Sequence, residues 1–327
     1  MRTLVNKTRL NETRDAAVRH GQSGLSLVEL LVAMVIGVVL VGGAGYVYVQ
    51  SRNSFGTNET VSRLQETARY AMSVIEPDVR MAGFWGLMND ADLVIGRATP
   101  AEAASGLLAS HICGNNYAFD LFNTVQGTDA GYPLACAPPG GAVLPNTDAL
   151  TVRRASAADV PAAAGKVQVY SSRTLARLFT GGAGGLPGPV GPGSGAQVND
   201  LVVHTYYVSR NSDNRPGLPS LRLRQLLNNG YDEQEIVTGV EDMQVQIGVD
   251  TAGTSGEATR YIDPAAPMPL GAQAVSVRLW ILVRSDTPEV GHADGRDYTM
   301  GNRVYSPRDG FRRVLITRTI QLRNSIG

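Results

Sequence analysis

The hydrophobic positions of the chain first form one long uninterrupted run. Residues 25–49 are apolar except for Glu29, the only charged residue among them, and they contain no proline. A helix of that length spans the ~30 Å hydrocarbon core of a bilayer. The apolar region of an ordinary secretory signal is shorter and is followed by a small-residue cleavage site. The run therefore predicts a transmembrane helix that stays on the protein.

Beyond residue 50 the apolar positions recur every three or four residues, as on one face of a helix. The recurring residues are Val61, Leu64, Ala68, Ala71, Met72, Ile75 and Val79. Such a stripe is more often a core face than a ligand site, so residues 50–86 are predicted to continue the helix, amphipathically, against a globular domain. Pro77 lacks an N–H group and disfavours helix at Glu76, which predicts a kink or an end there.

From residue 148 onward the pattern is that of strands separated by turns. Strand signals cover residues 148–156, 166–172, 200–209, 220–227, 235–250, 272–286 and 312–324. The last two alternate apolar and polar residues, as strands with one covered face do. Residues 87–148 show no long period, and the Gly- and Pro-rich residues 180–196 are predicted to form a flexible loop. The predicted fold class is α+β, with a long N-terminal membrane-spanning helix packed on a mainly antiparallel sheet.

The charges before the apolar run predict how the helix is oriented in the membrane. The leader before the apolar run holds five basic residues against two acidic ones, namely Arg2, Lys7, Arg9, Arg14 and Arg19 against Glu12 and Asp15. Basic flanks remain cytoplasmic, which places everything after residue 50 outside the inner membrane. The whole chain of 327 residues has a formal net charge of zero. It therefore lacks the basic excess of a nucleic-acid-binding protein, and no nucleic acid is assigned as a partner.

The chain contains two cysteines, Cys113 and Cys136. This count permits one disulfide and excludes a cysteine-rich metal site. An oxidising compartment outside the membrane suits a bond between the two, while a pair of free buried thiols is the less favoured alternative.

Candidate catalytic chemistry is sparse. The four histidines are scattered, none has the spacing of a metal site, and the Gly-x-Ser-x-Gly motif does not occur. The most suggestive cluster is residues 289–297, with His292, Asp294 and Asp297, but a Gly- and Asp-rich stretch between two strands is much more often a solvated hairpin loop. We expect no enzyme, no metal and no cofactor.

The stretch HGQSGLSLVELLVAM, residues 20–34, resembles the processing site of type IV prepilins and pseudopilins. The resemblance implies that a prepilin peptidase cuts between Gly24 and Leu25 and methylates the new amine on Leu25, a position where phenylalanine is usual. It also implies that Glu29 pairs with the N-terminal amine of a neighbouring subunit during assembly. Four helical residues rise about 6 Å, so amine and carboxylate lie roughly one turn apart along the axis. The alternative is an interfacial glutamate that reaches water.

Four further segments resemble the PilW-type minor pilins of type IV pilus assembly, which are related to the J-type pseudopilins of type II secretion. They are ARYAMSVIEPDVRMAGFWG (68–86), VTGVEDMQVQIGVD (237–250), VRLWILVRS (277–285) and RRVLITRTIQLRN (312–324). The likeness covers both ends of the chain well and residues 87–200 poorly. It implies a pilin-like fold with a cytoplasmic leader at 1–24, a transmembrane helix at 25–49, its periplasmic continuation at 50–86 and a β-rich periplasmic domain at 87–327.

The same resemblance implies a non-catalytic role in pilus priming or in a tip complex. The implied location is the bacterial inner membrane, crossed once, and then the assembled pilus. The implied partners are the prepilin peptidase, other minor pilins, the major pilin and a tip adhesin. Two alternatives stay open from the sequence: a minor pseudopilin of a type II secretion system, and a membrane-anchored periplasmic binding protein or enzyme.

Overall fold

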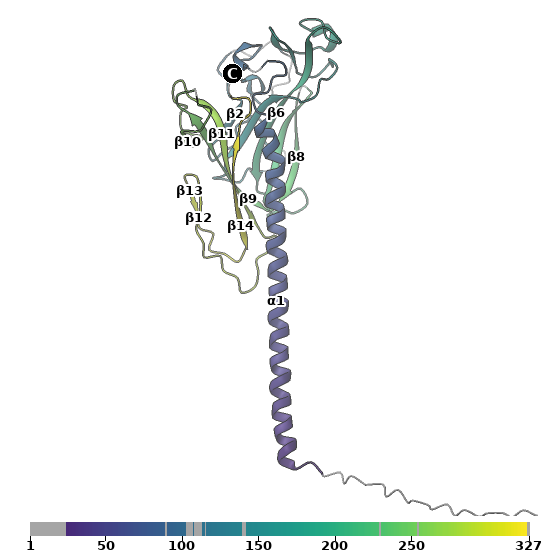
Figure 1. Cartoon of the computed structure of the whole chain (residues 1–327), viewed down its shortest axis with the longest axis vertical. Helices are drawn as coiled ribbons and strands as arrows, with labels where there is room; N and C mark the ends of the chain where they lie inside the picture. The colour runs from purple at the N-terminus through teal and green to yellow at the C-terminus, as the bar shows by residue number, and fades with distance from the viewer. Residues whose placement is uncertain are drawn as a thin grey trace, which may run out of the picture. The chain divides into compact units, whose positions relative to one another are not determined.

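The computed structural model shows one long helix and a set of β-sheets (Figure 1). It describes residues 24–88, 90–102, 107, 113–114, 116–138, 142–228, 230–253 and 255–325. The leader before Gly24 lies outside the described residues. The chain forms two compact units, Met1–Gly56 and Thr57–Gly327. The α+β fold class predicted from the sequence is confirmed.

Helix α1, Leu27–Arg80, is 54 residues long and contains Pro77. Of the kink or end predicted at Glu76, the end is wrong, because the helix continues for one more turn and Met81 N–H donates to the Pro77 carbonyl at 3.2 Å. Proline costs a helix one backbone hydrogen bond. In this turn Asp78 and Val79 are both buried, so tertiary contacts hold the residues beyond the proline in helical form.

The apolar stripe of α1 after Thr57 forms the centre of the main hydrophobic core, as predicted. Its buried members are Leu64, Ala68, Ala71, Met72, Ile75 and Val79. They pack with buried side chains from two different sheets, including Leu150 and Val208 of one and Val277 and Leu279 of the other. The stripe is therefore a packing surface, which is the ordinary role of such a pattern.

The strands form two main sheets, where the sequence suggested a single one. The larger holds β1 Val94–Ile95, β2 Val125–Thr128, β3 Ala149–Ala155, β4 Gln168–Ser172, β5 Ala176–Phe179, β6 Ala196–Ser209, β7 Ser220–Leu227 and β8 Gly230–Thr238. The smaller, in the order β10-β9-β11-β14, holds β9 Val240–Asp250, β10 Arg260–Ile262, β11 Gln273–Arg284 and β14 Arg313–Gln321. Every pairing except the short β1–β5 contact is antiparallel among the described residues.

Gly239 separates the two sheets. The strand signal over residues 235–250 looked continuous, yet β8 ends at Thr238 in the larger sheet and β9 begins at Val240 in the smaller one. Gly239 has φ +86°, and a Cβ built on it would lie 3.1 Å from the Arg284 carbonyl oxygen. Glycine adopts this backbone conformation without steric cost. It lets the chain leave one sheet and enter the other within a single residue.

The two long strands predicted near the C-terminus are present and pair with each other, but the single covered face that their alternation predicted is wrong for β11. β11 and β14 pair from Ser276 opposite Gln321 to Arg284 opposite Arg313. Val277, Leu279, Ile281 and Val283 lie in the main core. Residues of the opposite parity, including Trp280 and Leu282, pack instead with the hairpin of β12 Tyr298–Met300 and β13 Arg303–Tyr305. Both faces of β11 are thus covered.

The segments without a sequence period are irregular in the structure too. Residues 87–148 contain η1 Ala91–Leu93, η2 Tyr117–Phe119 and the short strands β1 and β2. The Gly- and Pro-rich residues 180–196 contain the single 3-10 turn η3 Gly182–Gly185 before β6 starts at Ala196.

Candidate assembly site at the start of the helix

The start of α1 is closed by a reciprocal pair of hydrogen bonds. Ser26 precedes the first helical residue, and the Glu29 N–H donates to Ser26 Oγ at 3.2 Å. The Ser26 N–H donates in return to Glu29 Oε2 at 3.4 Å. This is a capping box, in which serine and glutamate each satisfy a backbone N–H that the first turn leaves unpaired. The motif Ser-x-x-Glu before an apolar run was a readable signal for it, and the interpretation of Glu29 as an assembly residue missed this second role.

The apolar run that follows is exposed over its whole length. None of residues 25–49 is buried within the chain. Among the described residues, α1 is the one helix long and apolar enough to cross a membrane. Exposed apolar surface of this extent marks a membrane or protein contact. Glu29 and the leucine at position 25 therefore lie where another helix or lipid must cover them.

The other end of α1 is tied to the sheets by a cluster around Asp78. The Asp78 carboxylate accepts from Arg154 Nε at 2.7 Å on β3 and from the Tyr206 hydroxyl at 2.8 Å on β6. His204 Nδ1, also on β6, lies 2.6 Å from it. Asp78 is only 5% exposed, so these partners replace its hydration. We call these four residues the Asp78 cluster.

Several contacts determine the charge state of Asp78. Burial by itself raises the pKa of the carboxyl group. The hydrogen bond and charge of His204, the charge of Arg154 and the hydrogen bond from Tyr206 outweigh that effect, and the pKa of Asp78 is lowered from 3.8. The cluster joins residues that are far apart along the chain, so no local motif in the sequence predicted it.

The two cysteines form a disulfide, Cys113–Cys136, across 23 residues. Cys113 is fully buried in the second hydrophobic core, beside Phe119 and Leu121. Arg224 Nη2 on β7 lies 3.8 Å from Cys113 Sγ and 3.7 Å from Cys136 Sγ. The bond thus joins two irregular segments to each other, and the Arg224 contact places it against β7 of the larger sheet.

Residues 289–297 form a connection between β11 and β12 that is exposed at six of its nine residues, as the composition suggested, but Asp294 within it is buried. Asp294 is 2% exposed and accepts hydrogen bonds from Arg296 Nε at 3.1 Å and from the Tyr298 hydroxyl at 2.8 Å. Burial alone raises its pKa, but these two partners lower the pKa to about 2. Arg313 Nη1 lies 3.4 Å away, so Asp294 belongs to a buried ion network. The composition of the stretch did not reveal that partner, because Arg313 lies on another strand.

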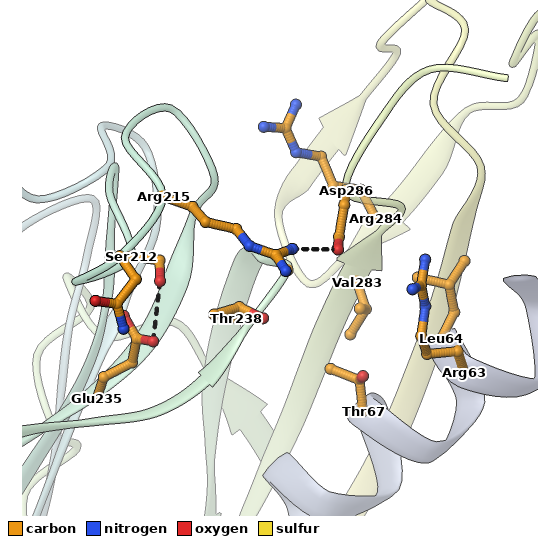
Figure 2. A pocket seen from close by; sticks show the side chains of 12 residues that line it. Arg63, Leu64, Thr67, Ser212, Arg215, Glu235, Thr238, Val283, Arg284 and Asp286 are labelled. Atoms are coloured by element: carbon orange, nitrogen blue, oxygen red, sulfur yellow. Dashed lines mark hydrogen bonds and ion pairs between the residues drawn. The ribbon is translucent and has the colours of Figure 1, made fainter.

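A cavity of about 460 Å³ lies between α1, β8 and the end of β11 (Figure 2). Two polar contacts join its lining residues: Arg215 pairs with Asp286 at 2.6 Å, and Glu235 accepts from the Ser212 hydroxyl at 3.0 Å. None of its lining residues is a histidine or a cysteine. No group of His, Cys, Asp and Glu among the described residues could hold a metal ion.

Comparison with known proteins gives two family matches. Residues 205–324 match the family model described as type IV pilus-assembly protein W. Residues 19–45 match the prokaryotic N-terminal methylation motif. The first match covers the region from the second half of β6 through β14, and the second contains Gly24, Leu25 and Glu29. No curated protein and no solved structure matches the chain.

An N-terminal methylation motif on an exposed apolar helix, followed by antiparallel sheets, is the arrangement expected of a membrane-anchored protein of the pilin class. Within that class, the two matches support a type IV pilus minor pilin of the PilW family. Proteins of this type are generally non-catalytic and interact with other pilus components. The two matches support the resemblance found in the sequence over residues 19–45 and 205–324, which together are less than half of the chain.

Proposed function

We propose that the protein is a non-catalytic minor pilin that takes part in the priming or tip complex of a type IV pilus. The observation that carries this proposal is Glu29, the only charge of residues 25–49, placed in the first turn of an exposed apolar helix inside a methylation motif. A charge in a membrane-length segment is costly and usually functional. The leader would face the cytoplasm, and residues after 50 the periplasm.

The proposed assembly contact is an ion pair between Glu29 and the methylated N-terminal amine of a neighbouring subunit. Within the described residues Glu29 Oε2 accepts one N–H bond from Ser26, and no bond to Oε1 is present. The carboxylate thus retains capacity for a cation while it caps its own helix. Once packed among apolar helices, an unpaired carboxylate would be strongly unfavourable, which favours a neighbour that brings an amine. The neighbours we propose are other minor pilins, the major pilin and a tip adhesin.

The first prediction concerns processing. We expect prepilin peptidase to cut after Gly24, so that the mature chain begins at an N-methylated Leu25. Mass spectrometry of the N-terminal peptide from the detergent-solubilised protein measures this directly. An intact leader beginning at Met1 in the pilus-associated protein would contradict the proposed processing.

The second prediction separates the two roles of Glu29. Glu29→Gln keeps a side chain that can complete the capping box but removes the charge, and Ser26→Ala removes the serine cap but keeps the charge. We expect Glu29→Gln to reduce incorporation into pili at least tenfold, and Ser26→Ala to leave it within about twofold. The measurement is quantitative immunoblotting of sheared pili against the membrane fraction.

Both substituted chains should still be found in the membrane, because the apolar run is unchanged. If the Glu29→Gln chain is incorporated into pili at the normal level, the proposed role of Glu29 in assembly is wrong. Equal loss from both substitutions would show that helix capping, and not charge, is what assembly requires. If pili form normally without the gene and protein secretion fails instead, the protein serves a type II secretion system.

A further inference from the structure

Strand β14 is the outermost strand of the smaller sheet. The sheet runs β10-β9-β11-β14, and β14 pairs with β11 on one side only. An edge strand of this kind presents backbone groups that another chain can bind. In Figure 1, β14 is the yellow-green strand labelled near α1.

The hydrogen bonds at the two ends of β14 show which residues face outward. The Leu322 N–H donates to the Val275 carbonyl at 2.9 Å, and the Ser285 N–H donates to the Arg312 carbonyl at 2.9 Å. Even-numbered residues therefore bond to β11, and the odd-numbered residues direct their N–H and C=O groups away from it. Leu315, Thr317 and Thr319 are the odd residues at the centre of the strand.

The outward groups have partners at the ends of the strand but none at its centre. At one end Arg296 Nη2 donates to the Arg313 carbonyl at 3.1 Å. Beyond the other end the Arg323 N–H donates to the Arg80 carbonyl at 3.2 Å. Among the described residues, no hydrogen bond reaches the backbone N–H or C=O groups of Leu315, Thr317 or Thr319 on that side.

Natural edge strands are usually blocked by proline, a bulge or several charges. The segment Val314–Thr319 has no proline, and its pairing with β11 shows no register shift. Thr317, Arg318 and Thr319 are exposed, and Arg318 is the single charged residue of the segment. The backbone of this edge is therefore open to an added strand, and Arg318 is the one charged side chain of the segment.

The positive charge of Arg318 indicates which kind of strand can pair with β14. Glu76 is one carboxylate shared by two guanidinium groups, since it pairs with Arg80 on its own helix and with Arg318 at 2.8 Å. The three side chains together are net positive. Antiparallel pairing of β14 with the β14 of a second copy would bring two such groups together, and like charges across a strand pair are destabilising. A strand that carries a carboxylate gains an ion pair in the same place.

We propose that the β14 edge binds, by strand addition, an extended segment of another pilus subunit that carries a carboxylate near Arg318. In strand addition the backbone hydrogen bonds supply affinity and the neighbouring side chains supply selectivity. This proposal rests on the proposed function, because it takes the partner from the pilus subunits. It assigns the contact to the sheet, away from the transmembrane helices.

The test uses Thr317→Pro in the full-length chain, co-expressed with the pilin subunits of its own assembly and solubilised in detergent. Proline removes the outward N–H of residue 317 and leaves the bonds between β14 and β11 in place. Thr317→Val is the matched control, since it keeps the N–H and the β-branched shape. We expect the co-purified pilin subunit, quantified by mass spectrometry, to fall at least tenfold with proline and to stay within twofold with valine.

Charge is tested separately with Arg318→Glu, which should reduce recovery of the same subunit at least fivefold. A photo-crosslinking residue at position 319 should join the chain to a strand of that subunit with an Asp or Glu within two residues of the crosslink. The melting temperature of each substituted chain, followed by tryptophan fluorescence, checks that the fold is retained. A crosslink to a helix, or to a second copy of the chain, would overturn the proposal.

Two failures are distinguishable. If pilin subunits co-purify equally with the unsubstituted chain and with Thr317→Pro, strand addition is wrong while the proposed function stands. If no pilin subunit co-purifies with the unsubstituted chain, the proposed function is wrong and strand addition falls with it.

Discussion

Replacing Asp78 by alanine is expected to lower the free energy of unfolding by about 3–5 kcal/mol, because it leaves a buried ion cluster without its anion. Arg154 and His204 are 16% and 20% exposed in their side chains and would lose their common partner. The loss is measurable by urea denaturation of the detergent-solubilised chain. Its two tryptophans, Trp85 and Trp280, are both buried and report unfolding by fluorescence.

The matched control is Glu76→Gln, two residues earlier on the same helix. Glu76 pairs with Arg80 and Arg318, whose side chains are 45% and 47% exposed. Ion pairs with exposed partners contribute about 0–1 kcal/mol, so we expect a correspondingly small change. Equal losses for the two substitutions would show that the Asp78 cluster has no special stabilising role.

The loss should also depend on pH. The folded pKa of Asp78 lies below 3.8, so its carboxylate stabilises the fold above about pH 4. That stabilisation is lost as the pH falls through the lowered pKa. The difference between the unsubstituted and Asp78→Ala chains should therefore shrink below pH 4. A constant difference from pH 7 to pH 3 would contradict the assigned charge state.

Arg313→Met is likewise expected to lower the free energy of unfolding by about 3–5 kcal/mol. Arg313 is fully buried at the start of β14 and contacts three carboxylates: Glu241 on β9, and Asp294 and Asp309 in the segment between β11 and β14. Methionine fills much of the volume but leaves the buried Asp294 and Glu241 with fewer cations. Urea denaturation again measures the loss.

Its neighbour Arg312 provides the control. The Arg312 side chain is 23% exposed and pairs with Glu289 at 2.8 Å. We expect Arg312→Met to cost about 1 kcal/mol or less, in line with ion pairs near the surface. If both methionine substitutions cost the same, the buried network is not what holds the segment between β11 and β14 in place.

The two clusters join elements of the second unit, Thr57–Gly327, that are distant in sequence. The Asp78 cluster joins the last turn of α1 to β3 and β6 of the larger sheet. The Arg313 network joins β9 and β14 of the smaller sheet to the segment that covers its outer face. In both clusters, hydrogen-bonded charge pairs replace the water around buried charges. Such directed contacts define the relative position of the joined elements more closely than apolar contacts alone.

The local patterns in the sequence predicted the long helix and the long strands, but not the short strands β1, β2, β5, β10, β12 and β13. Alternation at period two placed β11 and β14 within three residues of their ends, because side-chain direction in a strand depends only on parity. The apolar stripe of α1 likewise predicted which face of the helix is buried. Gly24, Leu25 and Glu29 form a local motif, and their proposed roles were readable for that reason. The Ser26 cap was also local and could have been read from the same letters.

What the sequence alone determined is therefore everything that depends on near neighbours along the chain: the apolar span, the helical face, the strand parity and the processing motif. The tertiary structure decided the rest. It carried α1 one turn beyond Pro77, divided one strand signal between two sheets at Gly239, buried Asp294 against Arg313, and left the β14 edge open. These features depend on free energies between residues distant in sequence, whose partners no local pattern specifies.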